Sequence, residues 1–207
     1  MKKVLFIILI FTICVPVFSQ ERPDALQMFR EGRFEEAVRI CRAELETMPR
    51  NLDSFVVLGW SLVSLGRYQE AIDYGLAALR ISRYDSRVIQ NLGEAHFHLG
   101  NNREALRYFE LFFSLVESGP RVAVTYYLVG EIYIRLGEFN NADIALTTAL
   151  HLSPNNTRWW ARLGYARERA GDFRFALEAY DRALQLNPAH AEALRGRERV
   201  LPRLSAS

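Results

Sequence analysis

Apolar residues recur along this chain at the three- and four-residue spacing of amphipathic helices, and short glycine turns interrupt them at regular intervals. The pattern is clear near the end of the chain, where one helical face contains Ala176, Leu177, Ala179, Tyr180, Ala183, Leu184 and Leu186. Similar apolar segments lie on both sides of each glycine turn. The pattern therefore predicts an all-α chain built from helix–turn–helix units.

One short motif, a glycine followed five residues later by an alanine, marks the turn of each unit. It begins at Gly32, Gly66, Gly100, Gly137 and Gly171, in steps of 34, 34, 37 and 34 residues. A unit of this length cannot bury its own apolar face, so neighbouring units have to stack. The period predicts a solenoid with an extended concave surface.

The residue types around each turn have physical reasons. The turn glycine can adopt a positive φ, which ends the first helix. Seven residues earlier lies a second glycine, which lets a neighbouring helix approach closely; these are Gly59, Gly93, Gly130 and Gly164. Two residues after the turn there is usually an aromatic residue that would fill the corner between the helices: Phe34, Tyr68, Phe139 and Phe173.

This combination resembles the tetratricopeptide repeat (TPR) family. The segments LGWSLVSLGRYQEAIDYGLAAL and LGYARERAGDFRFALEAYDRALQLNP carry its signature, and the resemblance covers nearly all of residues 21–188. It implies a right-handed α-solenoid of about five repeats with a C-terminal capping helix. The expected repeats are 20–50 (a partial N-terminal repeat), 51–84, 85–121, 122–156 and 157–188, and the capping helix and tail are 189–207.

Three departures from the repeat pattern carry their own predictions. The first repeat has only a stub for its first helix, from about Asp24 to Glu31. Residues 117–121, at the end of the third repeat, add three residues and a proline turn to the period, which predicts an offset in the superhelix. The arginine-rich segment from Ala189 to Leu201 is expected to be a polar helix that covers the last repeat.

The first 19 residues have the pattern of a secretory signal peptide. Lys2 and Lys3 precede an apolar run that starts at Val4, and cleavage is expected after Ser19. The run is short for a helix that needs about 20 residues to span a bilayer. The prediction is a protein exported to the bacterial periplasm.

Cys14 supports an alternative, a lipoprotein acylated on that cysteine. The bulky Ile13 stands where lipoprotein signals usually have a small residue, which favours the cleaved form. The alternative function is then a lipid-anchored TPR component of outer-membrane assembly or transport.

Charge and motifs exclude some functions. Lys2 and Lys3 are the only lysines, so cleavage would leave 24 arginines against 24 acidic residues, and no basic excess predicts nucleic-acid binding. Cys41 is the only cysteine after Ser19 and is expected to be a buried apolar residue, with an intermolecular disulfide as the alternative. We find no catalytic motif, and His96 and His98 lie on different helix faces, so we predict no enzyme, cofactor or metal. An envelope enzyme without a recognisable motif is a further alternative.

The expected function is a non-catalytic scaffold that binds a protein or peptide segment in its concave groove. In TPR arrays the first helices line that groove, and the resemblance places there Asp53, Val56, Trp60, Val63, Arg87, Gln90, Glu94, Phe97, Tyr127, Glu131, Ile134, Arg158, Tyr165 and Glu168. The aromatic members would supply rigid contact area for a partner. For each of them, packing between repeats is the alternative interpretation.

A second candidate surface is the apolar helix from Arg103 to Val116. It contains more large apolar residues than one packing stripe needs, so Tyr108 and Leu111 are expected to face outward. Either the inserted loop covers them, or they form a contact patch for a partner or a second copy.

Overall fold

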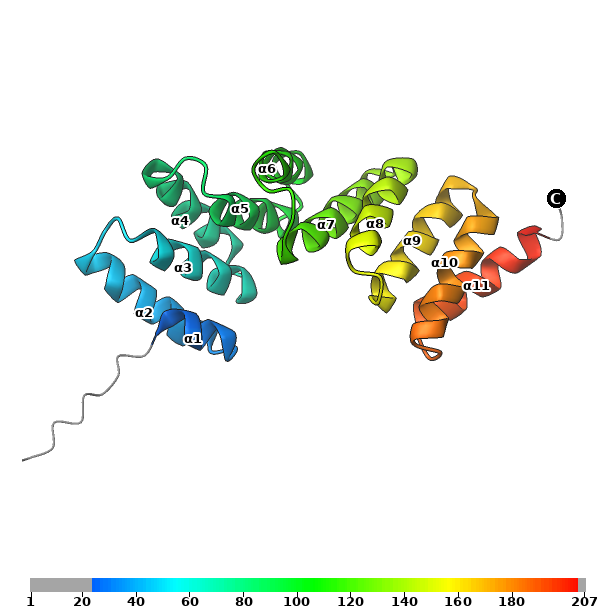
Figure 1. Ribbon diagram of the computed structural model, residues 1–207, viewed down its shortest axis with the longest axis horizontal. Helices are drawn as coiled ribbons and strands as arrows, with labels where there is room; N and C mark the ends of the chain where they lie inside the picture. Colours follow the sequence, from blue (N-terminus) through cyan, green and yellow to red (C-terminus); the bar gives the residue numbers. More distant parts are fainter. Residues whose placement is uncertain (1–23, 205–207) are drawn as a thin grey trace, which may run out of the picture.

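The structure, a computed structural model, describes residues 24–204. This part of the chain contains helices and no strand, which confirms the predicted all-α class (Figure 1). The helices are α1 (Ala25–Arg30), α2 (Phe34–Thr47), α3 (Leu52–Ser64), α4 (Tyr68–Ile81), α5 (Ser86–His98), α6 (Asn102–Leu115), α7 (Pro120–Leu136), α8 (Phe139–Leu152), α9 (Thr157–Ala170), α10 (Phe173–Leu186) and α11 (Ala191–Leu204).

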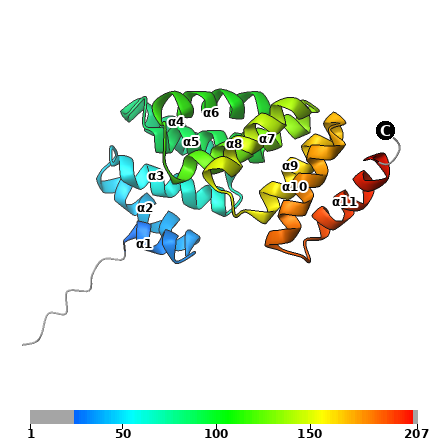
Figure 2. The same ribbon diagram turned by 45° about the vertical axis from the view of Figure 1, so that its right-hand side comes forward.

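The helix pairs stack side by side into an arc, with α1 and α11 at opposite ends (Figures 1 and 2). The odd-numbered helices are the first helices of the repeats, and neighbouring ones touch: α1 contacts α3, α3 contacts α5, α5 contacts α7, and α9 contacts α11. Neighbouring second helices between α2 and α10 make no comparable contacts within residues 24–204. Because the first helices lie closer together, they form the concave side of the arc.

The turn glycines adopt the backbone conformation that the motif requires. The φ angles of Gly32, Gly66, Gly100, Gly137 and Gly171 lie between 74° and 91°, where a residue with a Cβ atom is strained. This conformation lets the chain reverse between the two helices of each repeat. The turns therefore follow directly from the sequence motif.

The helix glycines allow the close approach that the sequence predicted. A Cβ atom on Gly164 would lie 2.7 Å from the ring of Tyr180, and one on Gly93 would lie 2.5 Å from the ring of Phe109. Both rings belong to the second helix of the same repeat. The spacing of the two helices in these repeats therefore depends on the missing side chain.

Buried side chains form a core that runs along the whole array. One cluster extends from α1 to the start of α7, a second from α5 to α10, and a third from α9 to α11. Because neighbouring clusters share helices, each repeat completes the core of the repeat before it. This arrangement is typical of a solenoid, in which a repeat contacts only its neighbours.

The three added residues lengthen a helix. Gly119 has a φ of 140° and Pro120 is the first residue of α7, which has 17 residues where α9 has 14. Proline suits the first turn of a helix because its missing N–H would have no partner there. Helix α7 therefore starts at Pro120, two residues before the predicted repeat boundary at residue 122.

The predicted outward position of Tyr108 is wrong. Tyr108 is buried and stacks on His96 of α5, with 5.5 Å between the ring centroids. Leu111 is half-buried and packs on the N-terminal core cluster. Phe113 stacks on Tyr126 of α7 at 4.1 Å, so the extra aromatic residues of α6 fill the junction with the neighbouring helices.

The C-terminal helix has features that suit it to end the array. The Leu163-Gly164 pair of α9 corresponds, one period later, to Arg197 and Glu198 of α11. Arg197 donates to Asp181 of α10 at 2.7 Å, while Gly196 lies against the ring of Tyr180. A charged pair at this position leaves no apolar surface on which a further second helix could pack. The predicted capping role fits the structure, although the helix runs to Leu204 and not to Leu201.

Cys41 is a packed core residue, as predicted. Its side chain is fully buried on α2, and burial raises the pKa of its thiol to about 12. We expect the Cys14→Ser variant, whose only thiol is Cys41, to react very slowly with Ellman's reagent at pH 8, because only the thiolate attacks. The reaction should become fast when urea unfolds the protein. Rapid stoichiometric labelling of the folded protein would contradict this prediction.

Candidate protein-binding surface

The exposed part of the concave face is smaller than the sequence predicted. Ten of the predicted residues are exposed or half-buried: Asp53, Trp60, Val63, Arg87, Glu94, Glu131, Ile134, Arg158, Tyr165 and Glu168. Four are buried: Val56, Gln90, Phe97 and Tyr127. Phe97 and Tyr127 expose almost none of their side chains, so the interpretation of these two residues as contact residues is wrong.

The buried aromatic residues pack between repeats. Tyr127 is 8% exposed and stacks on Trp159 of the next repeat, with 5.1 Å between the ring centroids. Burial raises the pKa of the Tyr127 hydroxyl to about 12. Phe97 lies under the guanidinium of Arg135, which is 3.9 Å from the ring centroid and donates to the Phe97 carbonyl oxygen at 2.8 Å. These rings hold neighbouring first helices together.

A series of arginine–carboxylate pairs runs along the same face. Each pair joins an acidic residue of one first helix to an arginine of the next: Asp53 to Arg87 at 2.8 Å, Glu94 to Arg121 at 3.5 Å, Glu131 to Arg162 at 2.6 Å, and Glu168 to Arg199 at 2.7 Å. We call these four pairs the arginine ladder. Arg121, Arg162 and Arg199 are not among the residues predicted for the groove. The pairs of Arg162 and Arg199 join residues 31 positions apart, and that of Arg87 joins residues 34 apart, which is about one repeat.

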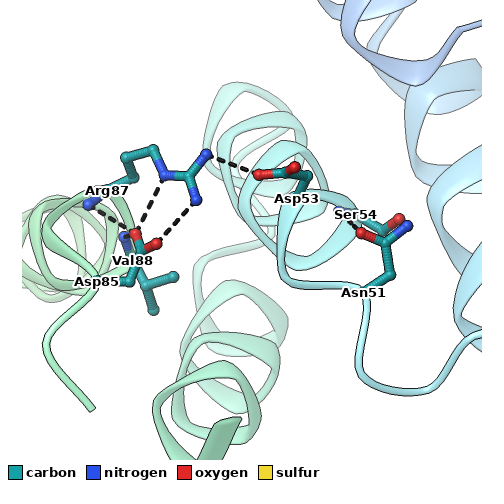
Figure 3. Close-up of polar contacts among 6 residues, drawn as sticks. All are labelled: Asn51, Asp53, Ser54, Asp85, Arg87 and Val88. Atoms are coloured by element: carbon teal, nitrogen blue, oxygen red, sulfur yellow. Dashed lines mark hydrogen bonds and ion pairs between the residues drawn. The ribbon is translucent and has the colours of Figure 1, made fainter. Parts of the chain in front are cut away.

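The first pair of the ladder is fixed from both sides (Figure 3). The two terminal nitrogens of Arg87 donate to Asp53 and to Asp85, each at 2.8 Å, and Asp85 also accepts from the backbone N–H of Arg87 and Val88 to cap α5. Although burial raises the pKa of Asp85, its hydrogen bonds from Arg87 and Val88 bring that pKa below its usual value. The bond to Asp85 also raises the pKa of Arg87, so both groups are charged at neutral pH.

Arg121 occupies the middle of the concave face. Its guanidinium lies 4.8 Å from the ring centroid of Trp60 on α3 and donates to the buried Gln90 of α5 at 2.6 Å. Gln90 in turn donates to Glu94 at 3.1 Å. Burial lowers the pKa of Arg121. The lengthened first turn of α7 therefore brings this arginine across α5 to α3 and covers part of Trp60.

A hollow of about 480 Å³ lies at the N-terminal end of the face. It is bounded by α1, the end of α2, the first half of α3 and Arg87 of α5. Its lining residues are Asp24, Ala25, Leu26, Glu44, Asn51, Asp53, Ser54, Val56, Val57, Trp60 and Arg87. A second hollow of about 590 Å³ lies among α8, α9 and α10, and its lining includes none of the predicted groove residues.

The described residues present no arrangement suited to metal binding. Between residues 24 and 204, His, Cys, Asp and Glu nowhere gather in groups of three or more that could hold an ion. His96 stacks on Tyr108 and His98 stacks on Tyr68, so the two imidazoles face different neighbours. A search of the same residues for a helix long and apolar enough to cross a membrane finds none.

Comparison with known proteins identifies the repeats. Family models described as tetratricopeptide repeat match residues 28–86, 123–156 and 157–190. Together these segments cover more than half of the chain. They match the turn motifs at Gly32, Gly66, Gly137 and Gly171.

Several known proteins are similar to this chain. The BBSome complex member BBS4 homolog of Drosophila melanogaster is 30% identical over 139 residues, which is 61% of this chain and 28% of that protein. The chain spans about a third or less of the curated relatives that it matches. A crystal structure of MamA has a TM-score of 0.70 at 22% identity and covers 83% of this chain and 98% of its own.

The crystal structure of YrrB has a TM-score of 0.68 at 21% identity, over 84% of this chain and 88% of its own, and is described as a TPR protein with an unusual peptide-binding site. At these identities the two structures establish the fold that they share with this chain.

Proposed function

Because the chain belongs to the tetratricopeptide repeat family, we propose that it is a non-catalytic scaffold that binds a segment of a partner protein on its concave face in the bacterial cell envelope. The observation that carries this proposal is the arginine ladder. It ties the first helices together on the side where their polar and aromatic side chains remain exposed.

The ladder lowers the cost of binding. Binding that fixes a long side chain in one conformation costs about 0.5–1.5 kcal/mol for each such side chain. Here the ladder arginines are already held by acidic residues of the neighbouring repeat, and Arg121 and Arg162 also lie over the aromatic rings of Trp60 and Tyr165. The face therefore offers a partner a surface that is organised before binding.

Trp60 and Tyr165 are the aromatic residues of the predicted set that remain accessible, and both are half-buried. Aromatic side chains in such positions give large contact area at low entropic cost. The printed description of YrrB, a repeat protein with a peptide-binding site, supports a peptide segment as the ligand of this fold. The membership of BBS4 in the BBSome complex supports a role in an assembly.

The envelope setting rests on the N-terminal sequence. Lys2, Lys3 and the apolar run from Val4, with cleavage after Ser19, would direct the chain to the periplasm. These residues, and Cys14 of the lipoprotein alternative, lie outside the residues that the structure describes. Mass spectrometry of the mature protein separates the two forms, because Gln20 at the amino terminus would rule out acylation of Cys14.

Affinity capture with matched variants tests the binding function. We expect Tyr165→Ala and Trp60→Ala to weaken capture of a crosslinked envelope partner about tenfold or more. Tyr165 is the cleaner test, because Trp60 also packs against the N-terminal core. Tyr84→Ala is the control, since Tyr84 is 59% exposed in the loop between α4 and α5 and belongs to none of the first helices.

Thermal melting of each variant serves as the control for folding. If the folded Tyr165→Ala and Trp60→Ala proteins capture the same partner as well as Tyr84→Ala does, the concave face is not the binding site.

A further inference from the structure

The hollow at the N-terminal end of the concave face lies beside a short first helix. Helix α1 has six residues, whereas α3 has 13. At a rise of 1.5 Å per residue, α1 is shorter by about 10 Å. Among residues 24–204, the first half of α3 therefore has less of a neighbour than α3 itself provides for α5, and the hollow of about 480 Å³ lies at this place.

The hollow combines apolar walls with an acidic rim. Ala25, Leu26, Val56, Val57 and Trp60 supply the apolar lining. Of the described residues, those that line the rim with a charge are the acidic Asp24, Glu44 and Asp53 and the basic Arg87. The rim is therefore acidic in total.

Arg87 does not neutralise the carboxylates of Asp24 and Glu44. Its guanidinium is held between Asp53 and Asp85, as Figure 3 shows. Asp24 caps α1 through the N–H of Leu26, and Glu44 accepts from the hydroxyl of Ser54 at 2.6 Å. Within residues 24–204 neither Asp24 nor Glu44 forms an ion pair. In the part of the chain that the structure describes, two negative charges beside an apolar hollow therefore have no paired cation.

Trp60 adds a separate observation. Its indole N–H is buried and finds no hydrogen-bond partner among the described residues, although the side chain lines the hollow. A buried donor without an acceptor is unfavourable, because it has lost its hydrogen bonds to water. A carbonyl oxygen of a bound segment would supply the acceptor.

We infer that this hollow receives a basic, apolar segment of the partner protein, in which a lysine or arginine faces Asp24 and Glu44 while neighbouring apolar side chains fill the space beside Val57 and Trp60. The inference rests on the proposed function, because it locates one end of the partner on the concave face. It also states the chemistry of that end, which is positively charged and apolar.

Conservative variants isolate the charges without removing their structural contacts. In Asp24→Asn/Glu44→Gln, asparagine still caps a helix and glutamine still accepts from Ser54. The matched control is Asp73→Asn/Glu110→Gln, which changes the net charge equally on exposed positions of α4 and α6.

The probe is a dye-labelled peptide of leucine and lysine, compared with the same peptide carrying glutamate at each lysine position. Fluorescence anisotropy with the purified protein measures both affinities. We expect the lysine peptide to bind at least about tenfold more tightly than the glutamate peptide. Asp24→Asn/Glu44→Gln should weaken the lysine peptide about three- to tenfold, and added salt should reduce the difference between wild type and variant. Trp60→Phe, which keeps the ring and loses the N–H, should weaken it about fivefold.

Several results would overturn the inference. These are equal binding of the two peptides, no binding of the lysine peptide at millimolar concentration, or an equal loss of affinity in both double variants, which would indicate unspecific attraction. Capture from the envelope separates this inference from the proposed function. If capture depends on Tyr165 but not on Asp24 and Glu44, the concave face binds its partner and the hollow does not; if capture depends on neither, the proposed function fails.

Discussion

Replacing Tyr180 with alanine is expected to lower the free energy of unfolding by about 3–5 kcal/mol. Tyr180 is fully buried on α10, and its ring lies between Gly164 of α9 and Gly196 of α11. Both glycines leave space that only this ring fills. Its hydroxyl donates to Glu168 at 2.7 Å, so the substitution also removes a hydrogen bond to a charged group. The variant therefore leaves a cavity where three helices meet.

Urea unfolding measures the loss, and hydrogen exchange locates it. Because each repeat contacts only its neighbours, α9, α10 and α11 should lose protection while α2 to α5 keep theirs. Tyr180→Phe is the control: it keeps the ring and should cost only about 1–2 kcal/mol, since Arg199 still pairs with Glu168. A cost below about 1 kcal/mol for alanine would mean that the helices close around the cavity.

Replacing Arg162 with methionine is expected to cost about 2–3 kcal/mol. The guanidinium of Arg162 donates to Glu131 of α7 at 2.6 Å and to Glu192 of α11 at 3.1 Å, and so connects three first helices. The Arg162 side chain is 20% exposed and that of Glu131 is 14% exposed. Although burial by itself lowers the pKa of Arg162, its bonds to Glu131 and Glu192 raise that pKa above its usual value. Methionine keeps most of the packing volume and leaves both carboxylates without their cation.

A matched arginine distinguishes this effect from that of an ordinary surface pair. Arg174 pairs with Glu178 of the same helix at 3.6 Å, and its side chain is 81% exposed. Arg174→Met should change the stability by no more than about 0.5 kcal/mol. A double-mutant cycle of Arg162→Met and Glu131→Gln then measures the coupling directly. A coupling energy near zero would show that this ion pair of the ladder does not stabilise the fold.

The candidate site was predicted in part. The resemblance placed the site on the first helices, and ten of the fourteen predicted residues lie exposed or half-buried there. Helical spacing could not separate Trp60 of α3 from Phe97 of α5, because each lies on an apolar face of its own helix and the spacing does not show which neighbours cover that face. Phe97 packs under Arg135 of α7, whereas Trp60 lies beside the hollow. The difference depends on how each repeat is rotated against the next.

The arginine ladder escaped prediction for the same reason. An arginine and a glutamate about one repeat apart, such as Glu131 and Arg162, are ordinary surface residues in the sequence. They become partners only when stacking brings neighbouring first helices together. Their spacing of about one repeat is the signal that could have identified them.

The sequence by itself determined the repeats, the turns and the all-α class, because a glycine with positive φ, a glycine within a helix and an apolar stripe act over a few residues. Only the tertiary structure decided which side chains of the first helices stay accessible, that the inserted residues lengthen α7 and carry Arg121 onto Trp60, and that the short α1 leaves a hollow beside α3. These features depend on the distance and rotation between neighbouring repeats. Contacts between residues far apart in the chain set that geometry, and no local pattern encodes it.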